Sequence, residues 1–295
     1  MFIRARAYLS AKFWAIFMAL QTYKMKVVII GSGNVATVLG GKIAAAGHTI
    51  LQVVARKSRD AAGLTGAELL AAQWGCDVVT DWANMMEGEA EAYIVALSDT
   101  ALTEFSERVR LPGRLVLHTA GAVPGKVLRP VSSHCGVLYP LQSLRREIRP
   151  FPEFPLLIDA DDPADIPVIE AFARTLSRQV QHADDELRLK LHLAAVVINN
   201  FSNYLYTLAA DFCRREGVDF RLLLPLIRET AARLEEHAPR AVQTGPAVRG
   251  DTATMEKHLE ILSNYKDLSD LYKLFSIHIK DYYAVEKKRD GDGGI

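Results

Sequence analysis

Four residues carry side-chain types that exchange protons or hold anionic groups, namely His118, Tyr139, His192 and Arg249, and a fifth, Asn200, carries an amide that can hydrogen-bond a substrate. An imidazole gains and loses a proton near neutral pH, so we interpret His192 as the candidate general acid or base. His118 or Tyr139 would be a secondary proton carrier. Asn200 would orient a substrate, and Arg249 would hold an anionic group, because a guanidinium pairs with carboxylates and phosphates.

One helical stretch places several of these polar residues among apolar neighbours. At 3.6 residues per turn, His192, Asn199 and Asn203 share a stripe, with Asn200 to one side. Buried amides and imidazoles need hydrogen-bond partners, so the stripe would suit a polar substrate or a nicotinamide carboxamide. The alternative is that the stripe hydrogen-bonds a neighbouring helix or the mate in a dimer.

Arg249 lies in the loop Thr244–Asp251, between two long helical stretches. Two glycines and a proline fix the backbone of this loop, and Asp251 or Thr252 would cap the next helix. Those residues have a structural reason to be there, whereas Arg249 has none. A cation on a rigid loop suits an anionic substrate group or a cofactor phosphate, and pairing with Asp251 is an equal rival.

A glycine-rich turn follows the first apolar run of the chain. Lys26–Ile30 is a short β-branched run, as expected of a strand buried on both faces of a parallel sheet. The glycines would permit a tight turn and a close approach of a pyrophosphate to the first N–H groups of a helix that runs to about Gly47. An ordinary Gly-rich turn is the alternative. The predicted cofactor contacts here are Gly31, Ser32, Gly33, Asn34 and Val35.

A second predicted strand, Thr49–Ala55, ends in Arg56-Lys57-Ser58. Proteins that bind NAD usually place an acid here for the ribose hydroxyls. A guanidinium can instead hold a 2′-phosphate, and Lys57 and Ser58 add donors, so the sequence favours NADP over NAD. The alternative is a solvated basic turn.

Strand-like and helical stretches keep alternating, with further strands predicted at Asp77–Thr80, Ala92–Leu97 and Arg114–His118. This rhythm predicts an α/β fold with a doubly wound parallel sheet of the Rossmann type. Ligands bind such sheets beyond the carboxyl ends of the strands, so Leu97-Ser98-Asp99 and His118 should face the cofactor. Alternatively, Asp99 caps the next helix and His118 is a hydrogen-bonded residue at a strand end.

The sequence predicts two domains after an N-terminal extension. Residues 25–183 would form the Rossmann domain, which two more strands and a closing helix complete; residues 184–290 would form an all-helical domain for substrate binding and dimerisation. The predicted elements are strands at Gly136–Gln142 and Pro155–Asp159 and helices at Pro163–Arg178, Leu187–Cys213, Phe220–Glu236 and Met255–Val285.

Residues 1–24 stand apart from this pattern. A basic start before the apolar stretch Phe13–Leu20 superficially resembles a secretory signal, but the stretch is short and no small-residue cleavage site follows. It is also too short to span a membrane. We interpret it as an over-extended translation start, with Met25 as the natural initiator, and expect it to be disordered or to form an extra helix.

Composition narrows the classes of partner. Lys plus Arg equals Asp plus Glu at 35 each, so no overall field attracts nucleic acid or an anionic membrane. Three widely spaced cysteines form neither a zinc pattern nor a disulfide framework, which fits a reducing cytoplasm. We therefore predict a cytoplasmic protein without a metal site, acting on a small molecule.

Several of these motifs together resemble one family. Gly31–Ala36, Ser98-Asp99, His118–Gly121, Tyr139–Gln142, His192–Phe201 and Thr244–Asp251 are similar to motifs of Rossmann-like proteins whose C-terminal helical domain is of unknown function. The resemblance covers Met25 to about Lys287. The glycine motif is shared more widely, with pyrroline-5-carboxylate reductase, the deazaflavin-dependent NADP reductases and the 3-hydroxyisobutyrate dehydrogenases. These relatives imply a homodimer built through helical domains, with substrate between the two domains.

The chain departs from its relatives at two positions. Many members of the family have His-Pro-Leu-Gln where this chain has Tyr139-Pro140-Leu141-Gln142, so a role of that histidine would pass to Tyr139 or His118. The lysine that serves hydroxyacid dehydrogenases on the equivalent helix is not evident, and His192 is the nearest candidate. We predict an NADP-dependent oxidoreductase that moves hydride between the nicotinamide and a small carbonyl, imine or hydroxyacid. The alternatives are a non-catalytic dinucleotide-binding regulatory protein and an imine reductase that resembles pyrroline-5-carboxylate reductase.

Overall fold

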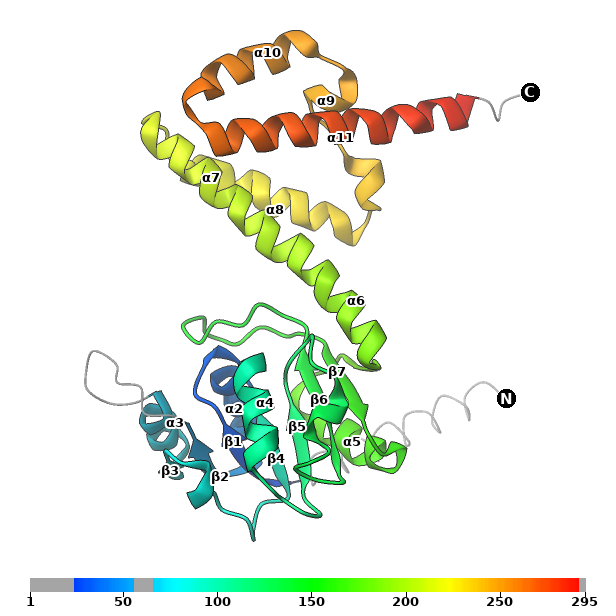
Figure 1. The fold of residues 1–295 in the computed structure, drawn as a ribbon. Coiled ribbons are helices and arrows are strands. Elements are labelled where there is room, and N and C mark those ends of the chain that lie inside the picture. The colour runs from blue at the N-terminus through cyan, green and yellow to red at the C-terminus, as the bar shows by residue number, and fades with distance from the viewer. Residues whose placement is uncertain (1–23, 56–65, 292–295) are drawn as a thin grey trace, which may run out of the picture. The chain divides into compact units, whose positions relative to one another are not determined.

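The computed structural model describes residues 24–55 and 66–291, with side chains up to residue 284 (Figure 1). Apart from Lys24, the predicted N-terminal extension lies outside the described residues, and so do Arg56, Lys57 and Ser58. The described residues up to Val197 form one compact unit, and those from Ile198 on form a second. The predicted domain limits, 25–183 and 184–290, stay a prediction.

The first unit is built on one eight-stranded sheet with the order β3-β2-β1-β4-β5-β6-β7-β8. All neighbouring strands are parallel except β6 and β7, which are antiparallel. The first six strands follow the Rossmann order, so the predicted fold class is confirmed. The strands are β1 (Lys26–Ile30), β2 (Thr49–Val54), β3 (Asp77–Val79), β4 (Ala92–Val95), β5 (Leu115–His118), β6 (Cys135–Pro140), β7 (Leu156–Ala160) and β8 (Val180–His182).

Helices cover both faces of this sheet, because strand side chains alternate between the faces. Val27 and Ile29 of β1 pack with α2 and α5, whereas Val28 and Ile30 pack with α4 on the opposite face. All four side chains are at most 1% exposed. The helices of this unit are α2 (Asn34–Ala45), α3 (Gly66–Trp74), α4 (Asp99–Arg108), α5 (Ile166–Leu176) and α6 (Asp185–Ala195).

Two elements near the end of the sheet differ from the sequence prediction. The closing helix is α5, which begins only after the 3-10 turn Pro163–Asp165, whose Asp162 cap accepts from Ala164 N. β8 was not predicted at all. Gln181 and His182 of β8 are exposed, so the strand lacks the apolar alternation that signals burial, and its backbone pairs with β7 at the sheet edge.

The second unit contains helices only among its described residues, as predicted. They are α7 (Ser202–Arg215), α8 (Leu224–Ala232), α9 (Pro246–Arg249), α10 (Thr252–Ile261) and α11 (Lys266–Gly291). The predicted single helix over 255–285 is wrong, because the 3-10 turn Leu262–Asn264 and Tyr265 separate α10 from α11. Apolar periodicity continues through this break and therefore hides it.

A second break interrupts the predicted helix over 187–213. The segment Val196–Phe201 is π-helical and joins α6 to α7. A π-turn contains more residues than an α-turn, so it rotates the residues that follow it relative to those before it. The stripe predicted for His192, Asn199 and Asn203 assumed uninterrupted α-helical spacing, and the structure departs from that assumption.

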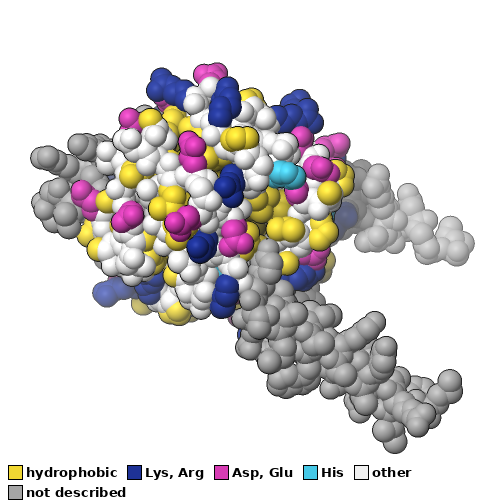
Figure 2. All heavy atoms as spheres, turned by 90° about the horizontal axis from the view of Figure 1, so that it is seen from below, with side chains coloured by type: hydrophobic (Ala, Val, Ile, Leu, Met, Phe, Trp, Pro, Cys, Tyr) yellow, Lys and Arg dark blue, Asp and Glu magenta, His cyan; other side chains and the backbone are white. Residues whose placement is uncertain are grey.

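The molecular surface agrees with the balanced composition. Figure 2 shows basic and acidic side chains interspersed over the described part of one face, without a continuous area of a single sign. Among the described helices, none is both long enough and apolar enough to cross a bilayer.

Candidate active site

The glycine turn after β1 has a strict steric requirement at its first residue. Gly31 has φ +122°, and a Cβ atom there would lie 2.2 Å from the Ala96 carbonyl oxygen. Its N–H donates to Val54 O at 2.7 Å. Gly31 therefore brings β1 into contact with the ends of β2 and β4, and only glycine fits.

The start of α2 offers backbone N–H groups without a side-chain cap. Gly33 is the N-cap residue, no side chain makes a capping hydrogen bond, and the first turn contains no acid. A Cβ atom on Gly33 would have no heavy atom within 4 Å. An uncapped helix start with its positive dipole end is suited to a phosphate, as the sequence predicts.

The glycine turn contacts three other parts of the fold: the loop after β6, the start of α3 and the buried core. Asn34 Oδ1 accepts a hydrogen bond of 3.4 Å from the N–H of Arg146, in the loop that follows β6 and crosses the sheet end (Figure 1). Ser32 lies beside Gly66 at the start of α3. Val35 packs against the buried core. These contacts hold the turn in position. Its contacts to a cofactor stay a prediction.

Close packing of α2 depends on residues that the motif does not include. A Cβ atom on Gly40 would lie 2.2 Å from the Trp74 ring, and one on Gly41 would lie 2.4 Å from the Phe151 ring. Two adjacent glycines inside a helix are the sequence signal for such an approach. Ala36, one turn before Gly40 on the same helix, is also buried, at 1% exposure.

The second predicted cofactor segment lies at the end of β4. Ser98 is the N-cap of α4, and its Oγ accepts from Ala101 N at 3.4 Å. Asp99 is the first residue of the helix and is exposed, so the alternative that Asp99 caps this helix is wrong. Leu97 packs at the edge of the core. β1 and β4 are neighbours at the sheet's switch point, where dinucleotides bind in this fold.

Two predicted proton carriers meet directly. The hydroxyl of Tyr139 on β6 lies 2.9 Å from Nδ1 of His192 on α6. Gly121 lies against both rings, since a Cβ atom there would be 2.6 Å from His192 Nδ1 and 2.9 Å from Tyr139 Cζ. Burial raises the pKa of the Tyr139 phenol, and the positive charge of Arg188 opposes that rise. Tyr139 and His192 therefore form a hydrogen-bonded pair next to the turn that follows β5.

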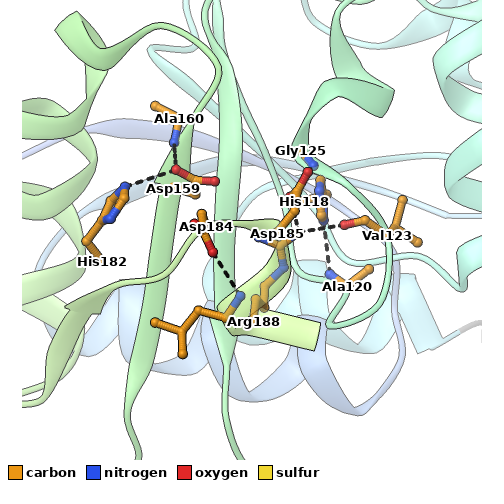
Figure 3. Close-up of polar contacts among 11 residues, drawn as sticks. His118, Ala120, Val123, Gly125, Asp159, Ala160, His182, Asp184, Asp185 and Arg188 are labelled. Atoms are coloured by element: carbon orange, nitrogen blue, oxygen red, sulfur yellow. Dashed lines mark hydrogen bonds and ion pairs between the residues drawn. The ribbon is translucent and has the colours of Figure 1, made fainter. Parts of the chain in front are cut away.

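His118, at the end of β5, has a different environment. Its side chain is fully buried, and Nδ1 accepts from the N–H of Ala120 at 3.2 Å (Figure 3). Burial, reinforced by the charge of Arg188, lowers the pKa of His118 to about 4. The imidazole is thus neutral at neutral pH and holds the turn after β5. This environment favours the structural alternative, and its role as a proton carrier stays a prediction.

Arg188 on α6 is a component of the site that the sequence prediction missed. Its guanidinium donates through Nη2 to Val123 O at 2.7 Å and to Asp185 Oδ1 at 2.6 Å (Figure 3). Asp185 Oδ1 also accepts from Gly125 N at 2.9 Å. The segment Glu186–Lys190 is rich in charge and reads as a solvated helix face, so nothing in the sequence indicates a buried arginine.

The hydrogen bonds around the carboxyl group of Asp185 keep it ionised. Its burial would favour the neutral acid, yet the hydrogen bonds from Gly125 N–H and from Arg188 outweigh that effect and lower the pKa of Asp185. The ionised carboxylate therefore ties the loop 119–125 to the start of α6. Because His192 lies one turn beyond Arg188, the same tie fixes the position of His192 beside Tyr139.

The asparagines of the predicted polar stripe are exposed instead of buried. Asn199, Asn200 and Asn203 are exposed in the single chain, and Asn199 Nδ2 donates to Asn200 Oδ1 at 3.4 Å. The π-helical segment carries the first two, and such segments frequently occur at functional sites. The amides are available for partners outside the chain, so the substrate role of Asn200 stays a prediction.

The loop that carries Arg249 has the structural features predicted for it. Asp251 caps α10, accepting from Thr254 N at 3.1 Å and from Thr254 Oγ1 at 2.7 Å. Gly250 ends α9 with φ +71°. Arg249 is exposed; its charge helps to lower the pKa of Asp251, after the hydrogen bonds from Thr254, but no salt bridge joins the two among the described residues. Arg249 therefore remains a candidate for an anionic group.

The fold and these contacts define a two-unit Rossmann protein with a buried polar site formed by residues of β5, β6 and α6. The family model described as a domain of unknown function (DUF2520) matches residues 154–279. A solved structure from Bacteroides fragilis, described as a candidate NADP oxidoreductase, is 36% identical and has a TM-score of 0.79; the match covers 89% of this chain and 99% of that one. The chain belongs to this family of Rossmann-fold proteins with a C-terminal domain of unknown function.

More distant solved structures share the fold alone. A reductive aminase from Aspergillus terreus in complex with NADPH and ethyl levulinate is 17% identical, with a TM-score of 0.61 over 88% of this chain and 95% of that one. A pyrroline-5-carboxylate reductase from Coxiella burnetii is 14% identical, with a TM-score of 0.51 over 88% and 97%. No curated protein matches the sequence.

Proposed function

We propose that this protein is an NADP-dependent oxidoreductase that transfers hydride between the nicotinamide and a small carbonyl, imine or hydroxyacid. The observation that carries the proposal is the hydrogen-bonded pair of Tyr139 and His192, 2.9 Å apart at the carboxyl end of β6. Ligands of this fold bind at that end of the sheet. A relative that is 36% identical is described as a candidate NADP oxidoreductase, which supports the reaction class.

Backbone and loop residues would hold the cofactor. The uncapped N–H groups at the start of α2 fit its pyrophosphate, and Gly33 leaves room for the close approach. Arg56, Lys57 and Ser58 would bind the 2′-phosphate; they lie outside the described residues. Bound NADPH would supply the hydride, and every other requirement of the reaction falls on the chain's own side chains.

Tyr139 and His192 would supply the proton. When a C=O or C=N carbon receives hydride, its heteroatom must gain a proton, and Tyr139 would donate it. His192 would hold the hydroxyl in position and return a proton to it afterwards. In the oxidation direction, the pair would accept the proton instead. Asn200 would orient the substrate, and Arg249 would bind its anionic group.

We further propose that the protein is a homodimer joined through its helical unit and that it acts in the cytoplasm. In the second unit, the only buried side chains among the described residues are Cys213, Ala247, Leu262 and Ser269. Large apolar side chains there stay exposed, with Ile198 at 73% and Ile277 at 58%. An α-helical unit with so small a core gains stability by burying this surface against a second copy.

The experiment that tests the cofactor is a titration of the purified protein with NADPH and with NADH, alongside Arg56→Ala. We expect NADPH to bind at least tenfold more tightly, about 1.4 kcal/mol, and the variant to lose that margin. If neither nucleotide binds, the proposal is wrong.

Turnover then requires a substrate panel. Ketoacids, aldehydes and cyclic imines would be offered with NADPH, and hydroxyacids with NADP, to the whole protein, Tyr139→Phe and His192→Ala. We expect at least one class to consume the cofactor, with each variant slower by a factor of about 10² to 10⁴. Tight binding of NADPH without turnover of any class would instead identify a non-catalytic dinucleotide-binding protein.

A further inference from the structure

Buried hydrogen-bond donors without acceptors gather at one place in the molecule. Of the four such side-chain atoms among the described residues, two are Nε and Nη1 of Arg188, and a third is Nε2 of the neighbouring His118, which meets the backbone of Pro124 without a well-formed hydrogen bond. Each unsatisfied donor costs about 1–3 kcal/mol, and more where the group is charged. Proteins retain such unfavourable groups mainly where they serve a function.

The charge of Arg188 is only partly compensated. Its side chain is 1% exposed, and the one carboxylate that contacts it, Asp185, is 45% exposed. Asp185 Oδ1 is also shared with the N–H of Gly125. Water screens a half-exposed carboxylate far more than a buried guanidinium, so a net positive potential remains inside the site.

That potential acts on Tyr139. Burial disfavours the phenolate of Tyr139, and Arg188 is the charged group that opposes this effect. The carboxylate of Asp185 competes with this effect, but it is half-exposed and shared with the N–H of Gly125, and His118 is neutral at neutral pH. A fixed charge that favours the ionised product of proton transfer is a form of electrostatic preorganisation.

We propose that Arg188 is a positioning residue for the proton donor, with two effects on Tyr139. Through Val123 and Asp185 it fixes the loop 119–125 against α6, and its buried charge favours release of the hydroxyl proton. The proposal rests on the proposed function. There, the O–H bond of Tyr139 would break while an O–H or N–H bond forms on the substrate, the carbon would be reduced by the hydride that NADPH supplies in becoming NADP, and His192 would return a proton from solvent.

The test measures ionisation at position 139 directly and needs no substrate. Tyr139 is replaced by 3,5-difluorotyrosine, whose phenol ionises nearer to neutral pH, and its absorbance is titrated in the full chain. The same titration is made with Arg188→Gln, which removes the charge but keeps N–H donors, and with the matched control Arg188→Lys, which keeps the charge.

The sign of the shift separates electrostatics from loosening. We expect the titration midpoint to rise in Arg188→Gln and to stay near its original position in Arg188→Lys. Loosening of the site would hydrate the phenol and move the midpoint down, so a lower or unchanged midpoint in Arg188→Gln overturns the proposal. If Arg188→Gln does not fold, Asp185→Asn and Asp185→Glu serve instead: both change the contacts with Gly125 and Arg188, but only Asp185→Asn removes the negative charge that opposes Arg188. The midpoint should fall in Asp185→Asn and stay in Asp185→Glu; an unchanged midpoint in Asp185→Asn, or an equal fall in both, overturns the proposal.

A parallel measurement keeps this outcome distinct from the proposed function. NADPH affinity is determined on the same proteins by quenching of fluorescence. Absence of NADPH binding with the expected midpoint shifts would contradict the proposed function and leave Arg188 as the group that sets Tyr139 ionisation. Normal binding with no midpoint shift would contradict only the role of Arg188.

Discussion

At the scale of single residues, the buried imidazole of His118 makes stability depend on pH. Unfolded, this group takes up a proton near pH 6.5, whereas in the folded protein its pKa is about 4. Between these values the unfolded state binds the extra proton, so the free energy of unfolding falls as pH falls, by about 3 kcal/mol in total. Urea unfolding at several pH values in this range measures the slope.

His118→Asn isolates this contribution, because the amide Oδ1 can still accept from Ala120 N while the titrating ring is gone. We expect the slope between pH 6.5 and 4 to become smaller in the variant, while His48, whose pKa is also lowered by burial, still contributes to it. The control His278→Asn, at an exposed position on α11, should keep the slope of the whole protein. An identical slope in His118→Asn would mean that the imidazole is not held neutral by the fold.

The sequence predicted part of the site. His192 was identified because an imidazole exchanges protons near neutral pH, and Tyr139 because it stands where many family members have a histidine; the two side chains are hydrogen-bonded to each other. Arg188 escaped notice because its neighbours on α6 are charged and exposed, and sequence cannot show that its side chain turns inward towards Val123 O. Such a direction depends on tertiary packing, which no local pattern contains.

At the scale of elements, a substitution at the start of α2 can change cofactor binding without destabilising the fold. Gly33 is the N-cap residue, has φ −82°, and has space for a side chain. Gly33→Asp would cap the helix and raise the free energy of unfolding by only a few tenths of a kcal/mol. Its carboxylate would meanwhile repel a phosphate, so we expect NADPH affinity to fall at least tenfold. Calorimetric titration with NADPH measures the affinity of the original protein and of Gly33→Asp.

Gly33→Asn is the matched control, since its amide caps equally well but has no charge. It should lose less affinity than Gly33→Asp at equal thermal stability. Equal loss in both variants would attribute the effect to side-chain volume, and no loss in either would exclude this helix start as the phosphate site.

Elements with a strong local signal were predicted well from the sequence. β1 runs from Lys26 to Ile30 as predicted, because a β-branched run before a glycine turn has one interpretation. The π-helical segment Val196–Phe201 and the break at Leu262–Asn264 were not predicted. Both lie inside continuous apolar periodicity, and their conformations follow from packing rather than from propensity.

At the scale of the whole molecule, the exposed apolar surface of the helical unit predicts that the stability of this unit depends on a partner. If a second copy covers its exposed apolar surface, melting must depend on protein concentration, because association stabilises only the folded chain. We expect Ile277→Glu, on α11 at 58% exposure, to shift sedimentation towards the monomer and to lower the melting temperature. Leu69→Glu, on α3 at 46% exposure, should change neither property. If the whole protein sediments as a monomer and its melting is independent of concentration, the dimer is contradicted, and the four buried side chains found among the described residues of this unit must suffice as its core.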